Sequence, residues 1–252
     1  MINKTQKENY ELYNDDCLNI MPKLKDKSIN CIICDLPYYK VSKEKYDNQW
    51  GNEESYIVWV EKLCLEWKRL LKDDGSLFIF TSRQMARKIG VILDKYFIEQ
   101  RIIIWKRKRA FNNTRGKTLS SGYEPISWYT NSDKFTFNNI KEKVNSNRKE
   151  YTEGYLSDGV CMSDVWDIPA LPHNSKEKVG HDTQKPLQLI KRIVEQFTNE
   201  GDIILDNCMG SGTTIISALQ LNRKSIGIEK EEKYFKLAVE RIRKEYNQNQ
   251  TL

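Results

Sequence analysis

The stretch that decides the fold is Ile29-Asn30-Cys31-Ile32-Ile33-Cys34, followed directly by Asp35-Leu36-Pro37-Tyr38. The apolar and β-branched residues of its first part predict a buried strand. A carboxylate, a rigid proline and an aromatic ring then follow the carboxyl end of that strand, which is where open α/β sheets bind ligands. Asp35 is able to accept a hydrogen bond from an amine, and Tyr38 offers a flat face to a planar group. The alternative is an ordinary turn in which Asp35 is a turn residue.

Strands and helices alternate on both sides of this stretch. Upstream, residues 11–13 predict a short strand, and the acidic pair Asp15-Asp16 after it suits either a ligand or the cap of a short helix. Downstream, an apolar stripe over residues 56–71 predicts a helix that ends at Asp73-Asp74-Gly75. A strand over 76–81, a helix over 83–95 and a strand over 101–105 follow. This alternation predicts an α/β fold with a mostly parallel sheet.

A second constellation lies near the carboxyl end of the chain. Residues 206–214, Asp-Asn-Cys-Met-Gly-Ser-Gly-Thr-Thr, separate a predicted strand from a helix, and the next strand ends in Glu229. This unit is typical of nucleotide binding, because glycines admit a ligand close to the backbone and an acid binds ribose hydroxyls. Ile215 stands where a dinucleotide fingerprint has its third glycine, and no Walker-type motif occurs. A ligand with an adenosine ribose but no pyrophosphate, such as S-adenosylmethionine, fits this departure.

The character of the chain changes at residue 106. Basic residues gather there without an acid among them, namely Lys106, Arg107, Lys108, Arg109, Arg115 and Lys117. Such a run is usually a solvated surface, but the interleaved Phe111 and the neighbouring ligand site are also typical of a nucleic-acid contact, so both interpretations stay open. Pro125–Thr130 and Lys134–Phe137, around Asn131-Ser132-Asp133, predict a β-hairpin. Residues of about 107–180 are therefore expected to form a specialised insertion outside the sheet core.

The composition of the chain limits the classes of protein to which it can belong. The 252 residues, 39% of them hydrophobic, suit one large globular domain, and the net charge of +6 suits a polyanionic partner. The chain has neither a bilayer-length apolar run nor the apolar core of a signal peptide at its start, so a cytoplasmic protein without membrane contact is expected. Cys31 and Cys34 lie in a predicted strand and point to opposite faces, so neither a metal site nor a redox site is expected there.

Three motifs together resemble a known family. Asp35-Leu36-Pro37-Tyr38 resembles the D-P-P-Y motif of amino-methylating DNA methyltransferases, and residues 206–214 resemble their D-P-F-x-G-S-G-T-T motif. Thr183-Gln184-Lys185-Pro186 is similar to the T-Q-K-P that precedes it. With the catalytic motif first and the cofactor loop last, the order is that of the β class. The resemblance implies a circularly permuted, Rossmann-like class I methyltransferase: a seven-stranded, mostly parallel sheet with one antiparallel strand. Residues 1–252 would form a single domain that contains a target-recognition insertion at about 107–180.

The resemblance also implies a role for each matching residue. The cofactor S-adenosylmethionine would be lined by Asp35, Asp206, Cys208, Met209, Gly210, Ser211, Gly212 and Thr213. Glu229 would hold its ribose, Asp16 its adenine amine and Lys185 its carboxylate. Asp35 and the Leu36 carbonyl would accept hydrogen bonds from the target amine, Pro37 would shape the turn, and Tyr38 would stack on a base flipped out of DNA. Leu36 departs from the family's proline, and Cys208 departs from an aromatic that usually packs near the cofactor.

The target atom and the class of activity have alternatives. Asp at the first position of the tetrad usually accompanies N6 of adenine in this family, and Ser usually accompanies N4 of cytosine, so adenine is expected. The other hypotheses are N4 of cytosine, a methyltransferase of protein glutamine or RNA, and a catalytically silent nucleic-acid-binding partner subunit. Dimers are frequent in the β class, so a homodimer is compatible with the resemblance.

Overall fold

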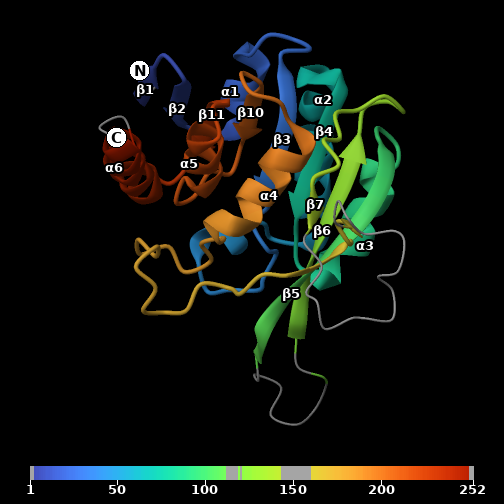
Figure 1. Ribbon diagram of the computed structural model, residues 1–252. Helices are drawn as coiled ribbons and strands as arrows, with labels where there is room; N and C mark the ends of the chain where they lie inside the picture. The colour runs from blue at the N-terminus through green and yellow to red at the C-terminus, as the bar shows by residue number, and fades with distance from the viewer. Residues whose placement is uncertain (1–2, 112–118, 120, 143–159, 250–252) are drawn as a thin grey trace, which may run out of the picture.

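A twisted sheet runs through the molecule and carries helices on both faces (Figure 1). The computed structural model describes residues 3–111, 119, 121–142 and 160–249. Among these, nine strands pair in the order β1-β2-β11-β10-β3-β4-β6-β5-β9. Their bounds are β1 Asn3–Lys7, β2 Tyr10–Asn14, β3 Ile29–Asp35, β4 Leu71–Phe80, β5 Ile98–Phe111, β6 Ser121–Thr130, β9 Val165–Asp167, β10 Ile203–Asp206 and β11 Lys224–Glu229. Two further short strands, β7 (Lys141–Glu142) and β8 (Val160–Cys161), pair separately.

The strand directions confirm the predicted fold class. β2, β11, β10, β3 and β4 are parallel neighbours, and β6 lies antiparallel between β4 and β5. These seven strands form the mostly parallel sheet with one antiparallel member that was predicted. The observed sheet is wider, because β1 adds an antiparallel edge and β9 a parallel one. Circular permutation stays a prediction.

β3 lies at the centre of this sheet. It is apolar along almost its whole length because both of its faces are covered, as expected of a parallel strand. Cys31 packs into the hydrophobic cluster on one face and Cys34 into the cluster on the other. The prediction that these two thiols point to opposite faces is therefore confirmed.

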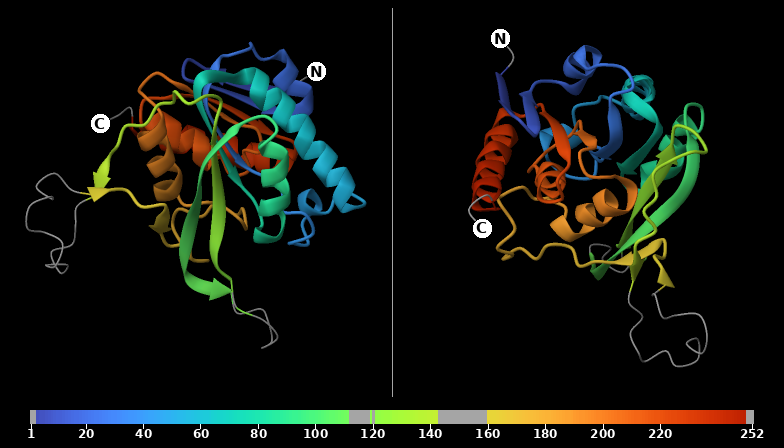
Figure 2. Two further views of the ribbon diagram at one scale, coloured as in Figure 1. Left: turned by 90° about the vertical axis from the view of Figure 1, so that its right-hand side faces the viewer. Right: turned by 45° about the horizontal axis from the view of Figure 1, so that its top comes forward.

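Helices cover the two faces in separate groups (Figure 2). One face carries α1, α2 and α3, and the other carries α4, α5 and α6. Their bounds are α1 Cys17–Ile20, α2 Glu53–Leu70, α3 Arg83–Leu93, α4 Leu187–Phe197, α5 Thr213–Gln220 and α6 Glu232–Asn249, with short 3₁₀ turns at Met21–Lys23 (η1) and Lys45–Asp47 (η2). Side-chain caps begin several of them: Asn52 accepts the Ser55 N–H and Ser82 the Met85 N–H. α2 ends before the predicted stop at Asp73, because Leu71 already has extended backbone and opens β4.

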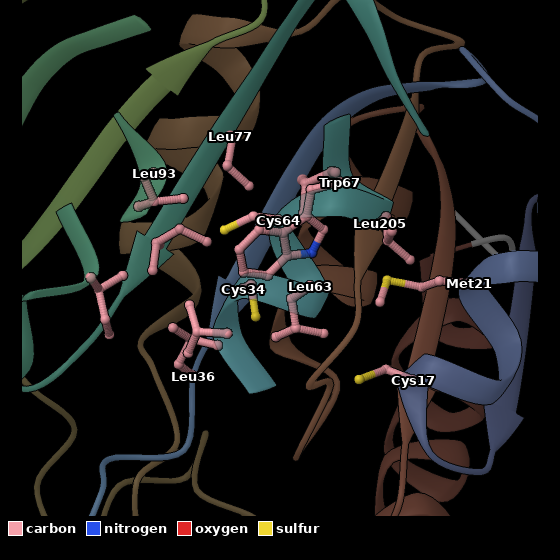
Figure 3. Close-up of a cluster of buried hydrophobic side chains, with 14 of the residues drawn as sticks. Cys17, Met21, Cys34, Leu36, Leu63, Cys64, Trp67, Leu77, Leu93 and Leu205 are labelled. Carbon is pink, nitrogen blue, oxygen red and sulfur yellow. The ribbon is translucent and has the colours of Figure 1, made fainter. Parts of the chain in front are cut away.

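Trp67 of α2 joins the helix layer to the carboxyl end of β10. Its side chain is fully buried within a cluster that includes Leu63, Cys34 and Leu205 (Figure 3). Its indole N–H donates to Asn207 Oδ1 at 2.9 Å. The segment after β10 is thus anchored in the core by a buried hydrogen bond, whose loss would leave a buried amide oxygen unpaired.

The predicted hairpin of Pro125–Thr130 with Lys134–Phe137 is wrong. β6 pairs instead with β5, while residues 134–137 form no strand. The Asn131 amide explains this, because it donates to the carbonyls of Leu71 and Lys72 and fastens the turn to β4. Past that point the chain leaves the sheet edge, and the Asn138 N–H donates to the Gln196 carbonyl.

The β5–β6 hairpin also corrects the expected extent of the insertion. β6 lies inside the sheet, so residues 107–180 are not wholly outside its core. The far end of the hairpin projects beyond the rest of the fold (Figure 1). None of the helices in the described ranges combines the length and the apolar composition needed to cross a membrane.

Candidate active site

Carboxylates gather where four parallel strands end. Asp35 ends β3, Asp206 ends β10, Glu229 ends β11, and Asp16 follows β2. Because these strands are parallel neighbours, their carboxyl ends meet at one edge of the sheet. All four acids line a single pocket there.

Most of the residues predicted for the site line that pocket. They are Asp16, Asp35, Leu36, Pro37, Tyr38, Lys185, Asp206, Cys208, Met209, Gly210, Ser211, Thr213 and Glu229. Gly212 is not among them. It caps α5 with a φ of +78°, and a Cβ there would lie 3.1 Å from the Ile242 side chain. Its lack of a side chain therefore serves the turn and the packing against α6.

Asp35 is held by a buried ion pair. Lys185 Nζ lies 2.6 Å from Asp35 Oδ2, and the lysine side chain is 8% exposed. The other oxygen, Oδ1, is buried without a hydrogen-bond partner in the described part of the chain. Burial raises the pKa of Asp35, and the Lys185 ammonium partly offsets that effect. The role predicted for Lys185, binding the cofactor carboxylate, stays a prediction; here its ammonium is engaged by Asp35.

The turn after Asp35 is held by a loop that follows it. Asp47 Oδ1 accepts the Tyr38 N–H at 2.6 Å, and its Oδ2 accepts the Ser42 N–H at 3.1 Å. The Tyr56 hydroxyl donates to the Pro37 carbonyl at 3.0 Å. The Leu36 N–H donates to the Phe80 carbonyl of β4. These bonds fix the backbone of the tetrad on both sides.

The glycine loop is fixed through Glu229. Its Oε2 accepts the Gly210 N–H and its Oε1 accepts the Glu231 N–H, each at 2.8 Å. Gly210 has a φ of +53°, and a Cβ there would come within 3.1 Å of the His181 ring. The close approach of the histidine explains why this position is glycine. Cys208 lies beside Cys17 and Cys34.

Three residues near the site were missed at the sequence level. Asp47 was one of several charged residues in a polar loop, and Glu124 directly precedes the strand that was predicted over Pro125–Thr130. His181 packs against the ring of Tyr234 at 4.5 Å, and burial lowers the pKa of His181 to about 4. Only His181 had a usable signal, since it directly precedes the Thr183–Pro186 motif.

The basic residues do not form one uniform surface. Lys106 is exposed and lies 3.6 Å from Asp167 of β9. Arg107 is largely buried and donates to Glu124 Oε1 at 2.7 Å, toward the site. Successive residues of a strand point to opposite faces, which explains the difference. Lys108 and Arg109 continue β5, and Arg115 and Lys117 lie outside the described residues.

No cluster of three or more metal-ligating side chains occurs in the ranges that the structure describes. Backbone N–H groups, Lys185 and Lys230 bond oxygens of these acids, although Asp35 Oδ1 has no partner among the described residues. Asp206 Oδ1, for example, accepts the Cys208 N–H at 3.1 Å.

Asp206 makes stability depend on pH. Burial raises its pKa from 3.8 to about 7. Between these values the folded state binds the proton more tightly than the unfolded state, so this group lowers the free energy of unfolding as pH rises from about 4 to about 7. Asp206→Asn should not lose stability in this way. In urea denaturation, the free energy of unfolding of Asp206→Asn minus that of the parent protein should be larger at pH 8 than at pH 5. Asp133→Asn, which changes an exposed carboxylate, is the control. Equal pH dependence in Asp206→Asn and the parent would contradict the raised pKa.

Comparison with known proteins identifies the family. A family model described as DNA methylase matches residues 29–240. The DNA adenine methyltransferase YhdJ of Escherichia coli K12 is 31% identical, over 92% of this chain and 82% of its own length. The type II methyltransferase M2.MboI of Moraxella bovis is 29% identical, over 93% of this chain and 88% of its own.

Solved structures agree. The M1.HpyAVI–SAM complex has a TM-score of 0.65 and 25% identity, covering 92% of this chain and 98% of that one. The cytosine-N4-specific PvuII DNA methyltransferase has a TM-score of 0.74 at 17% identity, covering 96% of this chain and 93% of that one, and shows likeness of fold alone. These matches, together with the pocket at the strand ends, show that the chain belongs to the N6/N4 family of amino-methylating DNA methylases.

Proposed function

We propose that this DNA methyltransferase transfers the methyl group of S-adenosylmethionine to the exocyclic N6 of adenine at a specific DNA sequence. The observation that carries the proposal is Asp35 Oδ1, a buried acceptor without a partner among the described residues, at the pocket that the glycine loop also lines. A buried acceptor left unpaired costs free energy, and an amine of the substrate would supply the missing donor.

The residues around the pocket fit the cofactor. Glu229 keeps its carboxylate in place with two backbone N–H groups, and its remaining lone pairs are suited to ribose hydroxyls. Asp16 lies at the same pocket and would accept from the adenine amine, while the loop from Asp206 to Thr213 would line the ligand. When bound, the cofactor supplies an electrophilic methyl group on a sulfonium. The M1.HpyAVI–SAM structure is a complex of that protein with this cofactor.

The chemistry of Asp35 follows from its surroundings. An exocyclic amine is a poor nucleophile because its lone pair is delocalised into the ring. Hydrogen bonds from the amine to Asp35 Oδ1 and to the Leu36 carbonyl would favour a tetrahedral nitrogen and stabilise the charge that develops on it. Tyr38 would stack on the flipped base, and the fixed backbone of the tetrad would hold the nitrogen in line with the methyl group.

Two observations favour adenine over cytosine. The tetrad begins with Asp35, the residue that usually accompanies adenine in this family, and YhdJ is named an adenine methyltransferase. The likeness to the cytosine-specific PvuII enzyme concerns the fold alone. A silent partner subunit is the alternative of another class, and the intact Asp35 and Tyr38 weigh against it.

The projecting β5–β6 hairpin is the proposed start of the target-recognition segment. Its strand β5 includes Lys106, Lys108 and Arg109, and the predicted cations Arg115 and Lys117 follow in the sequence, outside the described residues. Cations placed there would contact DNA phosphates while the pocket receives the base.

We also propose that the protein is a homodimer and is located in the cytoplasm. Sedimentation of the purified chain with and without DNA tests whether it is a dimer.

The product identifies the target atom. The purified chain, incubated with S-adenosylmethionine and amplified genomic DNA, should yield N6-methyladenine when the DNA is digested to nucleosides and analysed by mass spectrometry. Amplified DNA is chosen because it carries no earlier methylation. N4-methylcytosine as the main product would reassign the base, and the absence of any methylated nucleoside would contradict the activity.

Catalysis and cofactor binding should separate in two variants. Asp35→Ala should abolish methyl transfer yet bind S-adenosylmethionine nearly as well as the parent, because it removes the acceptor for the amine. Glu229→Ala should weaken cofactor binding by about 10- to 100-fold, since ribose hydroxyls would lose a buried partner. Titration calorimetry measures binding and tritium transfer measures activity. Full activity in Asp35→Ala would refute its catalytic role.

The hairpin cations should determine the salt dependence of DNA binding. The triple change of Lys106, Lys108 and Arg109 to Ala should weaken DNA binding, and the slope of log K against log salt should fall by roughly 0.9 for each phosphate that the variant no longer neutralises. Arg107 is left unchanged because it is paired with Glu124. A control that removes equal charge replaces the exposed Lys25, Lys62 and Lys236. If both triple variants keep the parental slope, the hairpin is only a solvated surface.

A further inference from the structure

Glu124 stands behind the active site. It lies on β6, paired with Trp105 of β5, and its side chain is 15% exposed. It is not part of the pocket lining, so it is not placed to touch a bound ligand. Any effect it has on the reaction must pass through its neighbours.

One carboxylate contacts both side chains that flank Asp35. The Tyr38 hydroxyl donates to Glu124 Oε2 at 3.2 Å, and Lys185 Nζ lies 3.8 Å from the same oxygen. Lys185 in turn bonds Asp35 Oδ2 at 2.6 Å. Arg107 donates to the other oxygen of Glu124 at 2.7 Å and anchors it from behind.

The charges along this line alternate: Arg107 positive, Glu124 negative, Lys185 positive and Asp35 negative. A buried ammonium with a single carboxylate partner carries a large desolvation cost, and a second carboxylate reduces it. Burial lowers the pKa of Lys185, but the charges of Asp35 and Glu124 outweigh this and raise it overall. Lys185 therefore stays charged between two anions, which fixes where its ammonium sits.

We infer that Glu124 is a positioning residue of the methyl transfer: it orients the Tyr38 ring through its hydroxyl and holds Lys185 against Asp35, so that Asp35 Oδ1 faces the target amine. This role rests on the proposed function of Asp35 and Tyr38. A purely structural role, as the partner of Arg107 within the hairpin, is the competing explanation, and it makes no demand on the chemistry at Asp35.

Three variants separate the two explanations. Glu124→Gln keeps the shape and an acceptor for Tyr38 but removes the charge that faces Lys185, while Glu124→Ala removes both. Tyr38→Phe removes only the hydroxyl. At saturating cofactor we expect kcat to fall by about 10-fold in Glu124→Gln and by up to about 100-fold in Glu124→Ala. The KM for S-adenosylmethionine should stay within about twofold, because Glu124 lies outside the pocket that would hold the cofactor.

A double mutant tests the link through Tyr38. If Glu124 acts partly through that hydroxyl, Tyr38→Phe should cost less in the Glu124→Ala background than in the parent chain. Glu99→Gln is the matched control, since Glu99 lies on β5 of the same hairpin and also accepts from a tyrosine hydroxyl, that of Tyr129 at 3.1 Å. It should keep parental kcat.

The pH profile supplies a readout that loss of structure would not move. Asp35 faces Lys185, Glu124, Tyr38 and, across the pocket, Asp206. The negative charge of Glu124 raises the pKa of Asp35, so its removal in Glu124→Gln lowers that pKa. The ionised carboxylate of Asp35 is the stronger acceptor for the amine, so activity should fall as pH falls through the pKa of Asp35. The acid limb of kcat should therefore move to lower pH in Glu124→Gln and stay in place in Glu99→Gln.

The outcomes distinguish the two levels of the proposal. A parent chain without methyl transfer would overturn the proposed function itself. An active parent, with Glu124 variants that keep parental kcat and an unmoved acid limb, would overturn the positioning role alone. If kcat and folding stability both fall in Glu124→Gln while the acid limb of the pH profile stays in place, Glu124 has a structural role in the hairpin.

Discussion

The parallel pairing of β10 with β3 is the constraint on which the site depends. Ile204 lies opposite Cys31 and Leu205 opposite Ile32, although the two strands come from opposite ends of the chain. This register brings the carboxyl ends of both strands to one edge, and with them Asp35 and the glycine loop. A shift of one residue would turn every side chain of either strand to the wrong face. Helices on both faces of the sheet hold the register by burying most of β3.

The pocket gathers acids that repel one another, and the fold offsets this in two ways. Backbone N–H groups bond the carboxylates of Glu229 and Asp206, and Lys185 pairs with Asp35. The compensation is incomplete, since burial still raises the pKa of Asp35, Asp206 and Glu229. Such an environment favours a ligand that carries positive charge, and the sulfonium and amino groups of S-adenosylmethionine have that property.

Local patterns predicted the parts of the molecule whose structure is local. The strand before Asp35, the opposed faces of Cys31 and Cys34, and the turn before α5 all follow from residues close together in sequence. The hairpin around Asn131-Ser132-Asp133 failed because turn signals mark where a chain bends and not which strand it pairs with. The Asn131 side chain binds the carbonyls of Leu71 and Lys72, which no local pattern indicates.

The sequence by itself determined the kinds of chemistry available: an acid and an aromatic ring after a buried strand, and a glycine loop with a second acid beyond it. The tertiary structure alone decided how these groups are paired. Lys185 bonds Asp35, Asp47 holds the Tyr38 backbone, and Glu124 receives the Tyr38 hydroxyl. These partners lie far apart along the chain or outside any periodic pattern. Their contacts form only when the whole chain has folded, because buried charges and polar groups bond to the partners that packing places within reach.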